Sequence, residues 1–387
     1  MQIHSTTQNS FKGYDARPLK GFIMSSNVHG IAEVMYKIGK KEGFKVFIPH
    51  QDAIIEKPKS SLQYEPKKIW AQDYWTIIKG KLLASHPDKN TELIQQAFNL
   101  NYEQNNSSQP DDNQSSNGIL TNIANHFQKI FKMTHSNNSP HIAGGNIFIM
   151  KDNTVLVGEY ELDNVSINDI KSRYSTKKVI VLPQMDFHLD LFIRPLDKNQ
   201  ILLADDQLTI DILRNGYKKF TQFMETLPPD KVHLYKRKYM LMECFIHNFE
   251  FDSNFQTLPK TNEVKTILEE NGYNVINVPG RIYEVIDKSD YFLYHYCNYM
   301  NANVLINKDN ELVFITNKSN VNEQMGLTKE ISKRINFNFE KAFVDSISKY
   351  VKPEHIYFVD DKDKFMSETM LKKLYGGIHC VCTEVPE

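Results

Sequence analysis

A short hairpin signature recurs along the chain, and this repeat constrains the fold more than any other feature of the sequence. Each copy has an apolar run, a polar turn rich in Asn, Asp or Gly, and a second apolar run, as in two antiparallel strands joined by a tight turn. The copies span 74–85, 146–159, 191–205 and 303–316. Their recurrence predicts a repeated supersecondary unit rather than a set of unrelated domains.

Stretches with helical periodicity, and short apolar runs with the length of a buried strand, lie between the hairpins. Expected helices cover 28–41, 119–133, 207–227, 262–270, 330–351 and 366–374. Expected single strands cover 45–49, 179–183, 275–279 and 356–359. The Met- and Tyr-rich stretch 235–244 is interpreted as part of the core or its wall. Hairpins and helices that alternate around a repeat predict an α/β fold of propeller-like form.

Residues 99–118 differ in composition from the rest of the chain. They read NLNYEQNNSSQPDDNQSSNG and are nearly free of large apolar side chains. Such a segment buries too little surface to offset its ordering entropy, which predicts a mobile surface insertion. A linker between two domains is the alternative. Because the hairpin pattern continues on both sides, we expect a single domain over 1–387 with an insertion at 99–118.

The charge balance limits the partners and the location of the protein. Lys and Arg total 46 against 47 for Asp and Glu, so the surplus of basic residues typical of nucleic-acid-binding or membrane-binding surfaces is absent. No run of about 18 apolar residues predicts a spanning helix. The first residues lack the basic start and apolar stretch of a secretory signal, and four cysteines are too few for a disulfide framework. We therefore expect a cytoplasmic protein.

Four polar clusters beside the predicted elements contain the residues that are able to carry chemistry. Asp73 precedes the first hairpin, and the Ala-Gly-Gly-Asn segment 143–146 opens the second, where paired glycines indicate a bulge or a close backbone approach. His188 and Asp190 are two residues apart, which on a strand places both side chains on one face. Cys380 follows paired glycines, where a substrate can reach a thiolate.

Each cluster also has a purely structural interpretation, as a cap, a bulge, a solvent-facing pair or an inert buried thiol. A metal site is a further alternative, but His188 and Asp190 have no third ligand at a convincing spacing. The Cys-x-Cys segment 380–382 likewise has no matching cysteine pair elsewhere in the chain. We therefore expect neither a metal nor another cofactor.

Together, Asp73, His188, Asp190 and Cys380 supply a nucleophile, a proton carrier and two carboxylates. Two fixed carboxylates suit a planar cation with paired N–H donors, which describes a guanidinium group. A thiolate can attack the central carbon of that group, and a histidine can protonate the departing nitrogen. A cysteine hydrolase that cleaves amides needs only one orienting carboxylate, so the second acid favours a guanidine substrate.

The order of these motifs resembles that of the guanidino-group-modifying (pentein) superfamily. W-x-[RQ]-D, G-G-N, H-x-D and G-G-I-H-C follow one another between Trp70 and Pro386. The motifs are closest to those of protein-arginine deiminases and agmatine deiminases, and the ending GGIHCVCTEVP is similar to that of agmatine deiminases. The resemblance implies a five-bladed α/β propeller with pseudo-fivefold repeats and a central funnel.

The resemblance also implies roles for individual residues. Cys380 would be the nucleophile, His188 the general acid and base, and Asp73 and Asp190 the groups that bind the guanidinium nitrogens. The reaction would pass through a covalent thiouronium on the cysteine, which water hydrolyses to a ureido product. Further residues would line the substrate site: Trp70, Gln72, Asn146 and Asn298.

Departures from the family pattern affect the expected substrate. Gln72 stands where agmatine and free-arginine deiminases usually carry Arg, and Ala143 stands where they carry an acidic residue. Both are more similar to protein-arginine deiminases, so peptidyl arginine is the expected substrate, with agmatine or free arginine as the alternative. Tyr74 replaces an acidic calcium ligand of the animal enzymes, so calcium independence is expected.

Two further hypotheses stay open at the level of the sequence. An amidinotransferase would use the same cysteine intermediate, but an amine rather than water would attack it. A propeller without catalysis would bind a partner protein. The motifs alone do not separate hydrolysis from amidino transfer, and they leave the oligomeric state undefined.

Overall fold

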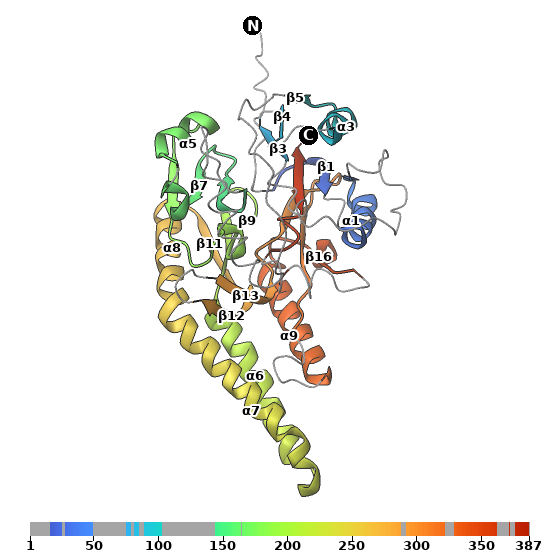
Figure 1. Cartoon of the computed structure of the whole chain (residues 1–387), viewed down its shortest axis with the longest axis vertical. Coiled ribbons are helices and arrows are strands. Elements are labelled where there is room, and N and C mark those ends of the chain that lie inside the picture. The colour runs from blue at the N-terminus through green and yellow to red at the C-terminus, as the bar shows by residue number, and fades with distance from the viewer. Residues whose placement is uncertain are drawn as a thin grey trace, which may run out of the picture.

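Strands and helices alternate along the chain in the computed structural model, which confirms the α/β class (Figure 1). The structure describes the following residues: 16–24, 28–48, 75–78, 81–84, 89–102, 144–163, 165–287, 292–321, 329–361, 371 and 376–386. The predicted helix 119–133 lies outside these residues, as does nearly all of 366–374.

One unit recurs in the described residues: a hairpin whose second strand pairs in parallel with a third strand that follows a helix. The first copy contains β3 (Trp75–Ile78), β4 (Lys81–Ala84), α3 (Lys89–Phe98) and β5 (Asn101–Tyr102). The second contains β6 (Ile147–Ile149), β7 (Val155–Gly158), α5 (Ile167–Tyr174) and β8 (Val179–Leu182). All four predicted hairpins are confirmed.

Two further copies of the unit follow along the chain. One contains β9 (Ile193–Pro195), β10 (Gln200–Ala204), the helices α6 (Asp206–Glu225), α7 (Pro229–Asp252) and α8 (Leu258–Glu270), and β11 (Asn274–Val278). The other contains β14 (Asn303–Ile306), β15 (Leu312–Asn317), α9 (Lys329–Ile347) and β16 (Ile356–Val359). The strands predicted at 179–183, 275–279 and 356–359 are therefore confirmed as the third strands of their sheets.

A fifth copy joins the two ends of the described chain. β1 (Leu19–Met24) pairs antiparallel with β17 (Cys382–Pro386), and after α1 (His29–Glu42) it pairs in parallel with β2 (Lys45–Phe47). The hairpin signal in the sequence could not show this pairing, because its two strands lie at opposite ends of the chain. The described strands form separate sheets rather than one closed sheet, so the circular arrangement of a propeller stays a prediction.

Local sequence explains where these elements turn and end. The three hairpin turns of the second, third and fourth predicted copies each contain a residue with positive φ: Asn153 (63°), Lys198 (58°) and Asn310 (61°). Asparagine adopts this left-handed conformation more readily than most residues, as the polar turn pattern anticipates. α1 ends at Gly43, whose φ of 96° and N–H bond to the carbonyl of Gly39 form a left-handed cap.

The third predicted unit is enlarged by a helical hairpin that projects from the sheets. α6 and α7 pack side by side and extend beyond the rest of the molecule in Figure 1. α7 continues through a π-helical turn, η6 (Ser253–Thr257), into α8. The interpretation of 235–244 as core or wall is confirmed for one face only: Met242 is in the core, and Tyr235 and Tyr239 pack against it. This stretch lies in the middle of α7, and only one face of the helix is buried there.

Two other parts of the fold differ from expectation. The expected insertion at 99–118 begins too early, because Asn101 and Tyr102 form β5 and pair with Lys81 and Leu82 of β4. A short strand can form through backbone hydrogen bonds alone, so the polar composition of this segment gave no sign of a strand. An additional two-stranded sheet, β12 (Arg281–Asp287) with β13 (Phe292–Asn298), lies outside the repeat and leads directly into residues of the site.

Candidate active site

The loop that carries Cys380 is held by two buried asparagine side chains. Backbone N–H groups donate from Ile378 to Asn317 Oδ1 at 2.8 Å and from His379 to Asn301 Oδ1 at 2.9 Å. At Gly377 an added Cβ would lie 2.4 Å from Asn317 Nδ2 and 2.7 Å from Asn301 Oδ1. The paired-glycine motif is therefore needed for this close approach, and it fixes the cysteine in the turn that precedes β17.

Asp190 lies on a second loop, which Asn146 holds in place. The Asn146 amide donates to Glu161 Oε1 at 2.8 Å and to the Phe187 carbonyl at 3.1 Å. Its oxygen accepts from Gln184 Nε2 at 2.9 Å and from the Leu189 N–H at 3.0 Å. These bonds occupy both amide hydrogens and both acceptor positions. Asn146 therefore positions the Asp190 loop, and its expected contact with substrate stays a prediction.

Asn301 connects the two loops at the Cys380 sulfur. Its amide nitrogen lies 2.9 Å from Asp190 Oδ2 and 3.1 Å from Cys380 Sγ. His379 Nδ1 also lies 2.7 Å from Asp190 Oδ2, and the sulfur lies 3.8 Å from the same oxygen. An amide that donates to sulfur favours the thiolate over the thiol, because the thiolate is the stronger acceptor.

His188 and Asp190 share the space beside Gly145, although not in the way that the sequence suggested. His188 is not on a strand but precedes the short 3-10 helix Leu189–Leu191 that contains Asp190. A Cβ added at Gly145 would lie 2.5 Å from His188 Nδ1 and 2.8 Å from Asp190 Oδ1. The two side chains therefore lie against the same glycine, and a side chain at position 145 would collide with both.

The carboxyl group of Asp190 is wholly buried, and this controls its charge. Burial raises its pKa to about 6, while the neighbouring His188 and Arg194 act in the opposite direction. Its Oδ1 atom has no hydrogen-bond partner among the residues that the structure describes. A buried acceptor without a donor is costly, and a bound cation with N–H groups would both satisfy it and favour its ionised form.

A buried layer behind the site supports Asn301. The Asn298 amide donates to the Leu191 carbonyl at 3.0 Å and lies 3.5 Å from His295 Nδ1, while its oxygen accepts from the N–H groups of Met300 and Asn301. The side-chain amide and oxygen of Asn298 thus have hydrogen-bond partners within the chain. Asn298 positions Asn301, and the substrate contact that the resemblance implied for it stays a prediction.

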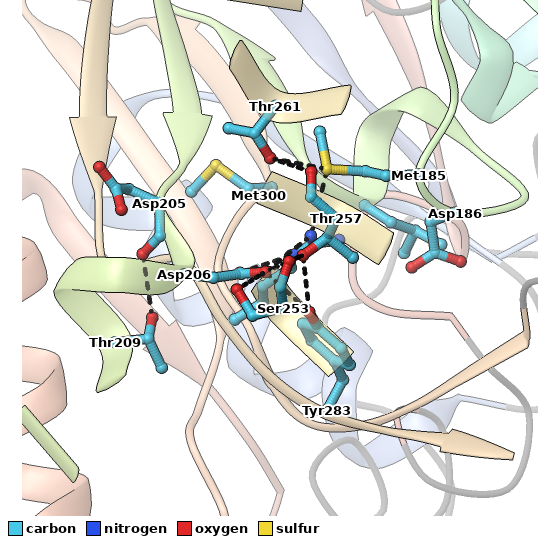
Figure 2. Close-up of polar contacts among 12 residues, drawn as sticks. Met185, Asp186, Asp205, Asp206, Thr209, Ser253, Thr257, Thr261, Tyr283 and Met300 are labelled. Carbon is cyan, nitrogen blue, oxygen red and sulfur yellow. Dashed lines mark hydrogen bonds and ion pairs between the residues drawn. The ribbon is translucent and has the colours of Figure 1, made fainter. Parts of the chain in front are cut away.

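The same layer contains an ion-pair cluster centred on Asp206. Arg281 Nε lies 3.2 Å from Asp206 Oδ1, and both side chains are almost fully buried. Figure 2 shows Ser253, Thr257 and Tyr283 around the same carboxylate, and the Tyr283 hydroxyl donates to it at 2.7 Å. The cluster joins the start of α6, the π-helical turn and β12, and therefore has a structural role.

The sequence predicted part of this site and missed the rest. Cys380, His188 and Asp190 come together as expected, whereas Trp70, Gln72 and Asp73 lie outside the described residues. Asn301 was missed, although the unusual density of asparagine in 298–303 was a signal for it.

The described part of the chain contains neither a cluster of metal ligands nor a membrane-spanning helix. No group of three or more His, Cys, Asp or Glu side chains there could hold a metal ion. None of the helices that the structure describes is both long enough and apolar enough to cross a bilayer. Cys382, close to the nucleophile in sequence, is buried, and burial raises the pKa of its thiol.

Comparison with known proteins adds structural neighbours but no relatives in sequence. No family model and no curated protein matches the chain. A solved agmatine deiminase from C. jejuni is similar over 100% of this chain and 99% of its own, with a TM-score of 0.49 and 14% identity.

An X-ray structure of a putative agmatine deiminase is similar over 98% of this chain and 96% of its own, with a TM-score of 0.46 and 11% identity. Both neighbours carry names from the class that the sequence motifs resemble.

Proposed function

We propose that this chain is a thiol-dependent hydrolase that converts a guanidinium group into a ureido group and releases ammonia. The observation that carries the proposal is the convergence of Cys380 Sγ, the Asn301 amide and the buried Asp190 carboxylate. A sulfur near a buried carboxylate, whose other oxygen has no hydrogen-bond partner among the described residues, suits a cationic, planar, N–H-rich substrate.

Substrate binding would use the pocket between the two loops. Two N–H groups of the guanidinium would face carboxylates, one of them Asp190, which places the central carbon near the sulfur. β3 lies beside β17, the strand that follows the nucleophile. Asp73 precedes β3 by two residues in the sequence, and we include it in the proposal as the second carboxylate.

The reaction would then proceed in two halves. The Cys380 thiolate attacks the guanidinium carbon and forms a C–S bond, and His188 protonates one amino nitrogen, which leaves as ammonia. The resulting thiouronium is attacked by water, which His188 deprotonates. The C–S bond breaks, the thiolate is restored and a ureido product leaves. One water is consumed for each ammonia released.

The group attached to the guanidinium defines two candidate substrates. A small guanidino compound such as agmatine or free arginine is the first, and it is of the kind for which the two solved neighbours are named. Peptidyl arginine is the second, and Gln72 and Ala143 favour it. We propose the small compound as the leading candidate, because the site recognises the guanidinium end and a small substrate needs no further contacts.

A substrate panel tests this proposal. Purified full-length protein is incubated with agmatine, free arginine and an arginine peptide, and ureido groups and ammonia are measured, with Cys380→Ser as the matched control. We expect equal amounts of ureido product and ammonia from a small guanidine and none from the variant. Product from the peptide alone would reverse the choice of substrate, and no product from any guanidine would refute the proposed activity.

An amidinotransferase is the competing outcome at the second half-reaction. Adding glycine or another primary amine to the panel separates the two reactions. Hydrolysis predicts that the yield of ureido product does not depend on the amine. A new guanidine product, detected by mass spectrometry at the expense of the ureido product, would show amidino transfer instead.

A further inference from the structure

α7 has apolar side chains on two opposite faces, and only one of them is covered. Met242, Ile246 and Phe249 are buried on the face that packs against α6 and the body of the protein. On the opposite face, and in the turn that follows, large side chains are exposed to solvent. This outer stripe comprises Leu234 (61% exposed), Met240 (53%), Leu241 (44%), Cys244, Phe251 (48%) and Phe255 (71%).

The outer stripe extends along the helix, with the polar residues His247 and Asn248 between Cys244 and Phe251. Met240, Leu241 and Cys244 line one surface hollow together with His233, Lys236 and Arg237. At 1.5 Å per residue the stripe runs for roughly 30 Å. An apolar surface of this length on a projecting helix is typical of a protein interaction site. Figure 1 shows α7 on the outer side of α6, where a partner can approach it.

Charges beside the outer stripe indicate what kind of partner fits. Residues 236–238 are three consecutive basic residues. Fourteen residues further along the helix, 250–252 comprise two acidic residues with a phenylalanine between them. Fourteen residues are close to four helical turns, so the two groups lie on the same sides of the helix. Basic and acidic ends on one helix are complementary to the same helix in the reverse direction.

We propose that the outer stripe is the interface with a second copy of this chain, with the two α7 helices antiparallel and the twofold axis beside Cys244. This axis places Lys236 near Glu250 of the second copy and Lys238 near its Asp252. Arg237 then faces the aromatic ring of Phe251 of the second copy, a favourable cation–π arrangement. Glu250 already pairs with Arg214 of its own chain at 2.5 Å, and its second oxygen can accept the lysine.

Sedimentation velocity of the full chain over a concentration series tests the interface. We expect dimers, and the substitution Leu241→Glu should weaken association at least ten-fold, because it buries two unpaired carboxylates. Phe337→Glu is the matched control, since Phe337 is 65% exposed on α9 and should leave the dimer unchanged. A wild-type chain that stays monomeric up to about 100 μM would overturn the proposal, and so would equal effects of the two variants.

A charge exchange tests the antiparallel arrangement. Lys238→Asp should weaken the dimer because it places two acids together at both ends of the interface. Adding Asp252→Lys to the same chain should restore association, because each charge pair is then formed with its signs reversed. A double variant as weak as Lys238→Asp would contradict the antiparallel pairing, as would a Lys238→Asp variant that dimerises normally.

The position of the axis is tested by cross-linking. Treatment with copper phenanthroline and oxygen should remove two electrons and two protons from the facing Cys244 thiols and form one disulfide between the copies. Cys244→Ser should dimerise without forming the covalent dimer. A non-covalent wild-type dimer that resists cross-linking would place the axis elsewhere. None of these outcomes depends on enzymatic activity, so the interface stands or falls independently of the proposed function.

Discussion

The amide of Asn301 donates directly to the sulfur of Cys380, the proposed nucleophile. Its two hydrogens point to different acceptors, Asp190 Oδ2 and Cys380 Sγ, while its oxygen holds the backbone of the nucleophile loop. One buried side chain therefore sets the distance between the sulfur and the carboxylate, and at the same time favours a negative charge on the sulfur.

Replacing Asn301 by Asp should reduce catalysis, although the new side chain has nearly the same size and shape. The new carboxylate would lie beside both Asp190 and the sulfur, and this repulsion should raise the pKa of the Cys380 thiol. We expect kcat/KM to fall by about 100-fold and the pH midpoint of Cys380 alkylation by iodoacetamide to move upward. Asn199→Asp in the exposed β9–β10 turn is the control. An unchanged alkylation profile in Asn301→Asp would refute the role assigned to the amide.

The buried carboxyl of Asp190 predicts a conflict between stability and function. Its pKa is raised to about 6, above its ordinary value near 4, mainly by burial. Between these values the folded protein binds more protons than the unfolded chain, so stability falls as the pH rises from about 4 to 6. Above pH 6 the folded protein bears the full free-energy cost of burying the ionised Asp190 carboxylate, which is on the order of 1–3 kcal/mol.

The substitution Asp190→Asn tests that conflict. At pH 8 the variant should unfold at a higher urea concentration than the wild type, because the buried charge is gone, and the difference should vanish near pH 4. Activity should be lost, since the amide cannot replace the carboxylate toward a cation. In the wild type, kcat/KM should rise with pH through about 6. A variant less stable than the wild type at pH 8 would contradict the assigned charge penalty.

At the scale of elements, the π-helical turn between α7 and α8 has an identifiable cause. Ser253 and Thr257, at its two ends, both direct hydroxyl groups to Asp206 at the start of α6. The same carboxylate is bound by Arg281 of β12. Since β12 pairs with β13, which ends at Asn298, this clamp fixes the segment from which Asn301 reaches the sulfur.

Breaking the clamp from one side should be costly. Asp206→Ala leaves the Arg281 guanidinium buried without its counter-ion, and we expect a loss of about 3–5 kcal/mol in the free energy of unfolding. Adding Arg281→Met removes the uncompensated charge and should recover a large part of that loss. Urea denaturation of the two single variants and the double variant measures the coupling. Additive effects in the cycle would show that the pair does not act as a unit.

At this scale, sequence patterns predict some elements of the fold, whereas others depend on tertiary contacts. Polar turns such as Asp152-Asn153 marked four hairpins correctly, because their turn geometry is local. β5 was missed since a two-residue strand has too few side chains to show a pattern. In α7 the prediction of a core or wall holds for the face of Met242, whereas Met240 and Leu241 are exposed, because composition does not reveal which face of a helix is covered.

Some residues of the site can likewise be predicted from the sequence, and others cannot. Cys380, His188 and Asp190 were predictable because each lies in a short motif whose chemistry is specific. Asn301 was not, because its role depends on two loops that lie 111 and 79 residues away in the sequence. For Asn146 and Asn298 the motifs predict contact with substrate, whereas their hydrogen bonds to the loops depend on tertiary structure and could not be predicted.

For the molecule as a whole, the pairing of its two ends places the nucleophile. Cys380 precedes β17, and β17 is held by β1 through the register Met24 to Cys382 and Ile23 to Thr383. The fifth copy of the repeated unit therefore exists only when the first and last described strands meet. The nucleophile reaches Asp190 only in this assembled fold, and the isolated C-terminal segment would lack the carboxylate.

The most direct test of the proposed chemistry is to observe the covalent intermediate. Full-length protein is mixed with an active guanidine, quenched in acid within one turnover, and analysed by peptide mass spectrometry. The account predicts a peptide containing Cys380 heavier by the mass of the substrate minus ammonia, absent from Cys380→Ser and decaying as ureido product appears. Ureido product that forms without this adduct, or in the Cys380→Ser variant, would contradict it.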